Sequence, residues 1–304
     1  MVKGIKMKQS LINKLNFTLY FILRQLFDAK FKQFRKIKIA SSEETLQQII
    51  DNRLSIARFG DGELTLLAGN NTGFQDKNEQ IISKLRHILK SDNSRVLIGL
   101  PYVWKNLWPL KYRAFEFWGG YLNRSITQHI LPFVSIEKQY YDTNFTRFYI
   151  DYRTDSNAKK LVPIIKKIWH NRNVCFIEGE FSRLGVGNDL FNNATDIKRI
   201  LCPSRNAFQV YDEIMSEAKQ LPKDTLILIA LGMTATCLAY DLSMYGYQAI
   251  DIGHIDVEYE WFKMKAKDKV ALDTKFVAES SFNNPVKNLH DAKYQSEIIA
   301  KIGI

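Results

Sequence analysis

The chain has 304 residues, of which 46% are hydrophobic and 25% are charged, so it can bury a core without disulfides and is neither disordered nor fibrous. Its net charge of +11 is uneven: residues 1–38 hold ten Lys and Arg against the single Asp28, a net +9 that leaves +2 for the rest. A nearly neutral body disfavours a nucleic-acid groove, which needs clustered Lys and Arg. The three cysteines lie far apart without metal-ligand spacing, which argues against structural zinc and is typical of a reducing cytoplasm.

Residues 1–40 are predicted to form a basic, amphipathic N-terminal arm. Only nine uncharged residues separate Lys14 from Arg24, and a bilayer span needs about 20. On a helical wheel the Leu and Ile residues of 11–26 gather on one half, Phe17 and Phe21 intrude on the polar half, and a cationic stretch follows. Two interpretations stay open: the helix packs on the body or on a second copy, or residues 10–38 lie on an anionic membrane surface. In the second case the protein is cytoplasmic and peripheral on the inner face of the membrane.

From residue 41 onward, apolar strands alternate with helices. We expect buried strands at 54–60, 94–101, 173–180, 197–203, 224–232 and 248–254, and helices at 41–50, 78–91, 158–172, 206–221 and 234–247. An aromatic-rich stretch, 102–149, is expected to be mostly helical. The pattern predicts an α/β class, with a Rossmann-like, mostly parallel sheet flanked by helices in one domain, 41–304. Ligands of such sheets bind beyond the carboxyl ends of the strands.

The first candidate site follows the strand at 54–60 and contains Arg58, Gly60, Asp61 and Glu63. In an extended segment, side chains two residues apart point the same way, so both carboxylates could hold Mg²⁺ or Mn²⁺ while a diphosphate completes the shell. The glycines let backbone approach the ligand, and we expect Arg58 and Gly60 to contact it. The alternative is a strand-to-helix turn in which Asp61 is the N-cap and Glu63 a first-turn acid.

The second candidate site follows the strand at 173–180. Gly185 and Gly187, next to Asn188 and Asp189, predict a tight loop whose N–H groups take phosphate or ribose oxygens, with Arg183 neutralising the phosphate. A third glycine is missing, so this is not a dinucleotide fingerprint. The alternative is a glycine turn with an Asn/Asp cap.

Two further segments follow the last two strands of the predicted series. Gly232 and Thr234 predict a helix N-terminus that favours anions, or else simple capping by Thr234. His254, Asp256 and Glu258 are candidate metal ligands or general bases. The alternative is that Glu258 and Glu260 are solvated acids of a first helical turn.

Together these segments resemble the GT-D type glycosyltransferases, formerly a domain of unknown function, over roughly residues 43–265. The residues that carry the resemblance are Arg58-Phe59-Gly60-Asp61-Gly62-Glu63, Ser182-Arg183-x-Gly185-x-Gly187-Asn188-Asp189-Leu190, Cys202-Pro203, Asn206-Ala207-Phe208, Ala230-Leu231-Gly232 with Thr234-Ala235, and Asp251-Ile252-Gly253-His254-Ile255-Asp256. The resemblance implies a nucleotide-sugar donor, typically a UDP-sugar, and a metal held by Asp61 and Glu63. Met233 stands where the family pattern leads us to expect Pro.

From this we expect a metal-dependent glycosyltransferase that moves a hexose from a UDP-sugar to a hydroxyl of a glycan acceptor, either a cell-surface polysaccharide or a glycoprotein glycan. Arg183, Asn188 and Asp189 would line the nucleotide site, and Asp256 or Glu258 would activate the acceptor. One alternative is a metal-dependent phosphohydrolase or nucleotidyltransferase that uses the same carboxylates. Another is a non-catalytic, nucleotide-binding membrane scaffold. The sequence predicts neither the sugar, the acceptor, the anomeric outcome nor the oligomeric state.

Overall fold

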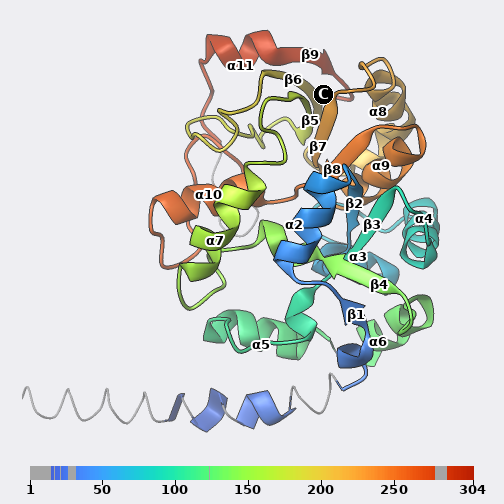
Figure 1. The fold of residues 1–304 in the computed structure, drawn as a ribbon, viewed down its shortest axis with the longest axis vertical. Coiled ribbons are helices and arrows are strands. Elements are labelled where there is room, and N and C mark those ends of the chain that lie inside the picture. Colours follow the sequence, from blue (N-terminus) through green and yellow to red (C-terminus); the bar gives the residue numbers. More distant parts are fainter. Residues whose placement is uncertain (1–14, 17, 21, 27–31, 123, 278–285) are drawn as a thin grey trace, which may run out of the picture.

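The structure, a computed structural model, describes residues 15–16, 18–20, 22–26, 32–122, 124–277 and 286–304. Within these residues nine strands form one sheet in which every neighbouring pair is parallel (Figure 1). The predicted α/β class with a parallel sheet is therefore confirmed. No helix of the described part of the chain is long and apolar enough to cross a bilayer.

The strands lie in the order β1-β4-β3-β2-β8-β7-β5-β6-β9 across the sheet. Their bounds are β1 Lys38–Ile39, β2 Ser55–Arg58, β3 Val96–Leu100, β4 Gln139–Asp142, β5 Asn173–Gly179, β6 Asp196–Cys202, β7 Leu226–Ala230, β8 Gln248–Asp251 and β9 Ile298–Lys301. The connections that leave β2 and β8 run to opposite sides, and so do those that leave β5 and β7. Such reversals open crevices at the carboxyl ends of a parallel sheet, where ligands bind.

Helices cover both faces of the sheet (Figure 1). The α-helices with printed bounds are α2 Ser42–Asp51, α3 Asp61–Leu67, α4 Glu79–Lys90, α5 Tyr112–Tyr121, α6 Arg124–Ile130, α7 Ser156–Ile165, α8 Tyr211–Ala218, α9 Met233–Met244, α10 Ile255–Lys263 and α11 Ala292–Glu297. Short 3-10 turns are η1 Phe34–Lys36, η2 Tyr102–Trp104, η3 Leu131–Phe133, η4 Thr143–Thr146 and η5 Ala207–Val210.

The strands divide their side chains between two hydrophobic clusters, because successive residues of a strand point to opposite faces. Ile56 packs in the cluster that contains apolar residues of α2 and α7, whereas its neighbour Ala57 packs in the cluster that contains those of α4 and α9. In β7, Leu228 and Ile229 divide in the same way. The strands β3 and β7 are buried on both faces, which explains why each is a continuous apolar run.

Each of the six predicted strands is present, but three strands were not predicted. β1 and β9 are the two edges of the sheet, and β4 lies within the stretch 102–149 that was expected to be mostly helical. The predicted helix at 158–172 is α7, which contains Pro163 and ends at Ile165. Residues 15–16, 18–20 and 22–26 of the predicted arm are helical, and the rest of residues 1–31 lies outside the described residues.

Candidate functional site

Asp61 and Glu63 follow β2 as predicted, but the segment is helical rather than extended. Helix α3 begins at Asp61, and residues two apart on a helix differ by about 200° around the axis. The expectation that both carboxylates point the same way is therefore wrong. Asp61 is exposed, whereas Glu63 is 7% exposed. The N-cap is Gly60 rather than Asp61, and the Gly60 N–H donates to Glu63 Oε2 at 2.7 Å.

Glu63 lies in a buried polar cluster. The hydroxyl of Thr236 lies 2.8 Å from the carbonyl oxygen of Arg58, 3.2 Å from Glu63 Oε1 and 3.4 Å from Asp251 Oδ2. Burial, together with the nearby Asp251 carboxylate, raises the pKa of Glu63 to about 7. Burial also raises the pKa of Asp251. One hydroxyl from α9 thus connects the ends of β2 and β8 with the first turn of α3.

Arg58 holds the carboxyl ends of two strands together. Its Nη2 donates to Asp251 Oδ1 at 2.8 Å, its Nε to the Asp251 carbonyl at 2.7 Å, and its Nη1 to Thr143 and Thr146. A Cβ on Gly253, which has φ +44°, would lie 2.0 Å from Arg58 Nη2. This position therefore needs glycine, and the guanidinium is a structural clamp. A ligand contact by Arg58 stays a prediction.

Arg183 is buried and bonded to a distant segment. Its Nη1 donates to the carbonyl oxygens of Thr274 and Lys287 at 2.8 and 2.7 Å. The Arg183 guanidinium thus has a structural role in holding this segment. The arrangement does not support the predicted phosphate contact through this side chain.

The loop that contains Gly185, Gly187 and Asn188 directs its polar groups to other parts of the protein. The Gly185 N–H and the Asn188 amide both donate to Asp256 Oδ1, at 3.0 and 2.8 Å. The Asn188 amide also donates to Glu260, and Lys275 Nζ lies 2.5 Å from Asp256 Oδ2. In this conformation the loop is a rigid connection to α10, and its role in holding phosphate or ribose stays a prediction.

Asp189 and Gly187 complete the loop. Asp189 accepts hydrogen bonds from Lys166 and from the Tyr259 hydroxyl, and these lower its pKa. Its carboxylate is thereby directed to α7 and α10. Gly187 has φ +81° with nothing within 4 Å of a Cβ, so the backbone conformation alone requires glycine there.

The three candidate bases after β8 have different surroundings. Asp256 is 1% exposed and paired with Lys275. Glu258 is fully buried and accepts the N–H groups of Tyr149 and Ile150 at 3.1 and 3.0 Å, and burial raises its pKa to about 7. Glu258 is thus no solvated first-turn acid, so that alternative is wrong for Glu258, whereas Glu260 is partly exposed. His254 is partly exposed at the start of α10.

A pocket of about 60 Å³ lies at the carboxyl ends of β5, β6 and β7, in one of the two crevices. Its lining residues are Phe74, Gln75, Gly179, Ser182, Pro203, Ser204, Ala207, Ala230, Leu231, Gly232, Met233 and Phe276. Sequence reasoning quoted several of these as motif residues but assigned a role only to Gly232. Ser204 follows the predicted strand at 197–203, and this position could have indicated that it lines the pocket.

Two features make this pocket suitable for an anion. Helix α9 begins here with Gly232 as N-cap, at φ +53°, and no side chain caps it, so the alternative of capping by Thr234 is wrong. The buried Ser204 hydroxyl has no hydrogen-bond partner among the described residues. Uncapped N–H groups and the helix dipole favour negative charge at this end of the helix.

The pocket lies beside the turn that carries Asp61. A Cβ on Gly62 would lie 2.6 Å from Sδ of Met233, so the first turns of α3 and α9 are in close contact. Met233, the departure from the expected Pro, thus packs against Gly62. The turn that carries Asp61 therefore lies next to a residue that lines the pocket.

The residues present fit a hard divalent cation. No group of three or more His, Cys, Asp or Glu side chains within the described residues is arranged to hold a metal by itself. Mg²⁺ is commonly bound by one or two carboxylates together with substrate phosphates and water. Asp61 is exposed for such a task, and each oxygen of Glu63 keeps a lone pair beside its hydrogen bond.

The chain matches the family described as glycosyltransferase GT-D fold over residues 56–280. It is 38% identical over 270 residues to "Glycosyltransferase GlyD" of Streptococcus pneumoniae serotype 4, covering 88% of this chain and 33% of that protein. It is 36% identical over 271 residues to "Probable glycosyl transferase Gly" of Streptococcus gordonii, covering 88% of this chain and 39% of that protein. The chain thus spans about a third to two fifths of these relatives.

Two solved structures are similar to the chain along nearly their whole length. One is described as the highly conserved domain of unknown function 1792 with a distinct glycosyltransferase fold, at TM-score 0.87 and 38% identity, covering 91% of this chain and 100% of that one. The other is described as a new glycosyltransferase from Streptococcus sanguinis, at TM-score 0.81 and 37% identity, covering 87% of this chain and 99% of that one.

Proposed function

Because the chain belongs to the glycosyltransferase GT-D fold family, we propose that it transfers a hexose from a UDP-sugar to a hydroxyl of a glycan acceptor. The acceptor glycan belongs to a cell-surface polysaccharide or a glycoprotein. The observation that supports this most is the contact between Gly62 and Met233, which brings the turn that carries Asp61 next to the uncapped N-terminus of α9.

The donor diphosphate would bind in the pocket at the start of α9. The first N–H groups of α9 and the hydroxyls of Ser182 and Ser204 are donors there, and the helix dipole adds favourable electrostatics. A volume of about 60 Å³ suits a phosphate group rather than a whole nucleotide, so uridine and sugar would extend beyond this pocket.

Asp61 would hold Mn²⁺ or Mg²⁺ in this site together with the donor phosphates, whereas Glu63, predicted as the second ligand, lies on the buried side of the same turn. When bound, such an ion neutralises negative charge on the departing UDP. Asp61 supplies its carboxylate directly from the first position of α3. Glu63 would act by positioning, because its bond to the Gly60 N–H fixes the turn that carries Asp61.

Activation of the acceptor hydroxyl is assigned most readily to His254 among the three predicted bases. Asp256 and Glu258 are buried and already bonded to protein donors, whereas His254 at the carboxyl end of β8 is partly exposed as a residue, with its Nε2 atom buried. A general base must come within hydrogen-bond reach of the proton that it accepts. Asp256 and Glu258 would then shape the site by positioning the loop and α10.

Donor turnover separates this proposal from a phosphohydrolase. We expect UDP-sugar hydrolysis, or transfer to an added glycan, to release intact UDP and to depend on Mn²⁺. Mass spectrometry of the products decides: release of inorganic phosphate favours the hydrolase, and UDP binding without turnover on any donor and acceptor favours a non-catalytic scaffold.

The metal assignment is tested with Asp61→Asn and, as a matched control, Glu79→Gln. Glu79 is also an exposed acid at the first position of its helix, but it lies outside the proposed site. Both variants lose a favourable helix-dipole contribution of about 0.3–1 kcal/mol. Only Asp61→Asn should abolish Mn²⁺-dependent turnover, as measured by donor hydrolysis against Mn²⁺ concentration. Unchanged turnover and metal dependence in Asp61→Asn would refute the assignment.

A further inference from the structure

The described helical residues of the arm, 15–16, 18–20 and 22–26, present an apolar stripe to solvent. Leu15 is 62% exposed, Leu19 46%, Ile22 49% and Leu26 55%. At 100° per residue these four positions fall within about 60° of one another on the helix. An exposed apolar stripe of this kind indicates an interaction surface.

The stripe is not the face by which the arm docks on the body. Tyr20, about 130° from the middle of the stripe, is 8% exposed, and its ring lies 4.9 Å from that of Phe115 and 5.8 Å from that of Trp108. The Arg153 guanidinium lies 4.8 Å above the Tyr20 ring. The described pieces of the arm run beside α5 (Figure 1). These contacts fix the rotation of the helix and leave the apolar stripe without a partner in the described residues.

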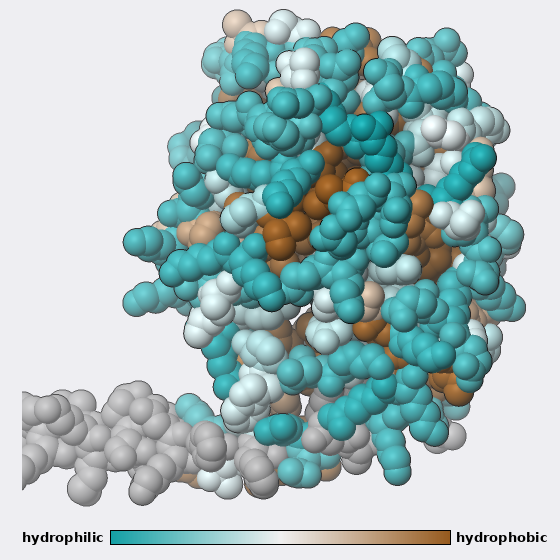
Figure 2. Space-filling view, in the orientation of Figure 1, coloured by the Kyte–Doolittle hydropathy of each residue, from teal (hydrophilic) through white to brown (hydrophobic). Residues whose placement is uncertain are grey.

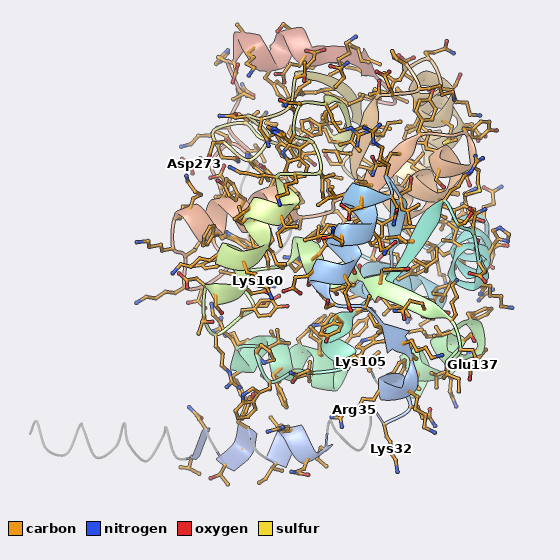
Figure 3. All side chains as sticks on the ribbon, in the orientation of Figure 1. Lys32, Arg35, Lys105, Glu137, Lys160 and Asp273 are labelled. Carbon is orange, nitrogen blue, oxygen red and sulfur yellow. The ribbon has the colours of Figure 1, made fainter. Side chains whose placement is uncertain are left out.

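Basic side chains accompany the stripe. Phe34 and Ile37 are each 1% exposed and anchor the turn at residues 32–37, while Arg35 and Lys36 between them, and Lys32 before them, are exposed. Figure 3 shows Lys32 at the lower end of the molecule, extending away from the body. The whole segment 1–38 carries a net +9 against +2 for the rest of the chain. The face in Figure 2, by contrast, is mainly hydrophilic over the body, with hydrophobic side chains showing in a hollow near its centre.

We propose that the arm lies flat on an anionic membrane surface, with the stripe of Leu15, Leu19, Ile22 and Leu26 in the headgroup boundary. Lys32, Arg35 and Lys36 then contact acidic headgroups. A helix with one apolar face and adjacent cationic residues binds at such an interface through apolar burial and electrostatic attraction together. A second copy of this chain fits less well, because it brings the same positive charge to the same surface. This inference is independent of the reaction that the body catalyses.

Vesicle flotation with the full chain tests the proposal. We expect binding to phosphatidylcholine vesicles that contain phosphatidylglycerol, weak binding to phosphatidylcholine alone, and release by salt. Each basic residue near an anionic surface changes partitioning about fivefold, so Lys32→Gln with Lys36→Gln should weaken binding about 25-fold. Equal binding to neutral vesicles, or binding that salt does not weaken, would overturn the electrostatic part of the proposal.

The apolar part is tested with Leu19→Asn and Ile22→Asn together, against Met264→Asn and Ile299→Asn as control. The control residues are 56% and 43% exposed but lie outside the arm. Only the arm variant should lose vesicle binding, with the thermal unfolding temperature of both variants unchanged. Should the pair destabilise the helix, Leu15→Asn alone still has to weaken binding. Retained binding in the arm variants would overturn the proposal, as would a dimer that is abolished by the same variants while no vesicles are bound.

Discussion

Gly253→Ala should destabilise this protein far more than an ordinary glycine substitution. The new Cβ would lie 2.0 Å from Arg58 Nη2, so the guanidinium has to leave its position. It would then lose its 2.8 Å contact with Asp251 Oδ1 and its bonds to Thr143 and Thr146, all in a largely buried setting.

The expected cost follows from two contributions. Alanine at positive φ costs about 1–2 kcal/mol, whatever surrounds it. Breaking a buried ion pair costs about 3–5 kcal/mol, because a charge is left without its partner. Gly69→Ala is the matched control, since Gly69 has φ +80° and nothing within 4 Å of a Cβ. The free energy of unfolding of Gly253→Ala should thus fall by about 3 kcal/mol more than that of Gly69→Ala.

Urea unfolding of both variants measures this difference. In thermal unfolding it corresponds to roughly 5 °C, because an unfolding entropy of about 2.1 cal/mol/K per residue gives about 0.6 kcal/mol per degree for this chain. A double-mutant cycle sharpens the test: in an Arg58→Ala background, Gly253→Ala should cost no more than Gly69→Ala. Equal costs for the two glycine variants in the wild-type background would refute the close approach of Arg58 to Gly253.

Three further variants test buried polar groups. Arg183→Ala should lower the free energy of unfolding by about 1.5–3 kcal/mol, because the carbonyl groups of Thr274 and Lys287 lose a charged donor. Calorimetry should show a smaller change in the free energy of UDP binding. A loss of UDP affinity at unchanged stability would favour the phosphate contact. Burial raises the pKa of Asp142 to about 6, so the folded state binds this proton more tightly than the unfolded one. Its contribution to stability therefore falls as pH rises from about 4 to about 6, and Asp142→Asn should flatten this part of the urea-unfolding profile; an unchanged slope contradicts the shift. Lys275→Met should cost about 3–5 kcal/mol in urea unfolding because Asp256 is left buried without its cation, whereas a cost under about 1 kcal/mol would show that the pair is dispensable.

The sheet was predictable wherever burial on both faces left a signature in the sequence. Leu226–Ala230 is a continuous apolar run, and its neighbour β5 contains a similar run at residues 174–177. β4, with the sequence QYYD, and the edge strand β9, whose residues alternate between partial burial and exposure, have no such run. Their place in the sheet is set by pairing with β3 and β6.

The candidate site was predictable in position but less so in the direction of its side chains. Asp61 and Gly232 follow β2 and β7, as predicted. Since the sheet is parallel, the carboxyl ends of both strands lie at the same edge. Whether Glu63 points outward depends on a helix that begins one residue earlier than an N-cap at Asp61 would allow. The partner of Asp256 is Lys275, and that of Arg183 includes Lys287, 104 residues away. Local spacing carries no information about such partners.

The position of β2 in the sheet also constrains the order in which the chain can fold. β2 pairs with β3 on one side and with β8 on the other. Ile56 therefore pairs with Ile250, which lies far from it in the sequence. During synthesis the first four strands emerge well before residues 248–251. Until β8 emerges, the side of β2 that faces away from β3 has no partner strand, and Arg58 lacks its Asp251 partner. Pairings of such long sequence separation close late and fold slowly. The halves of the sheet therefore join at the strand boundary that carries the Arg58 clamp, and the crevice there is completed only when nearly the entire domain has left the ribosome.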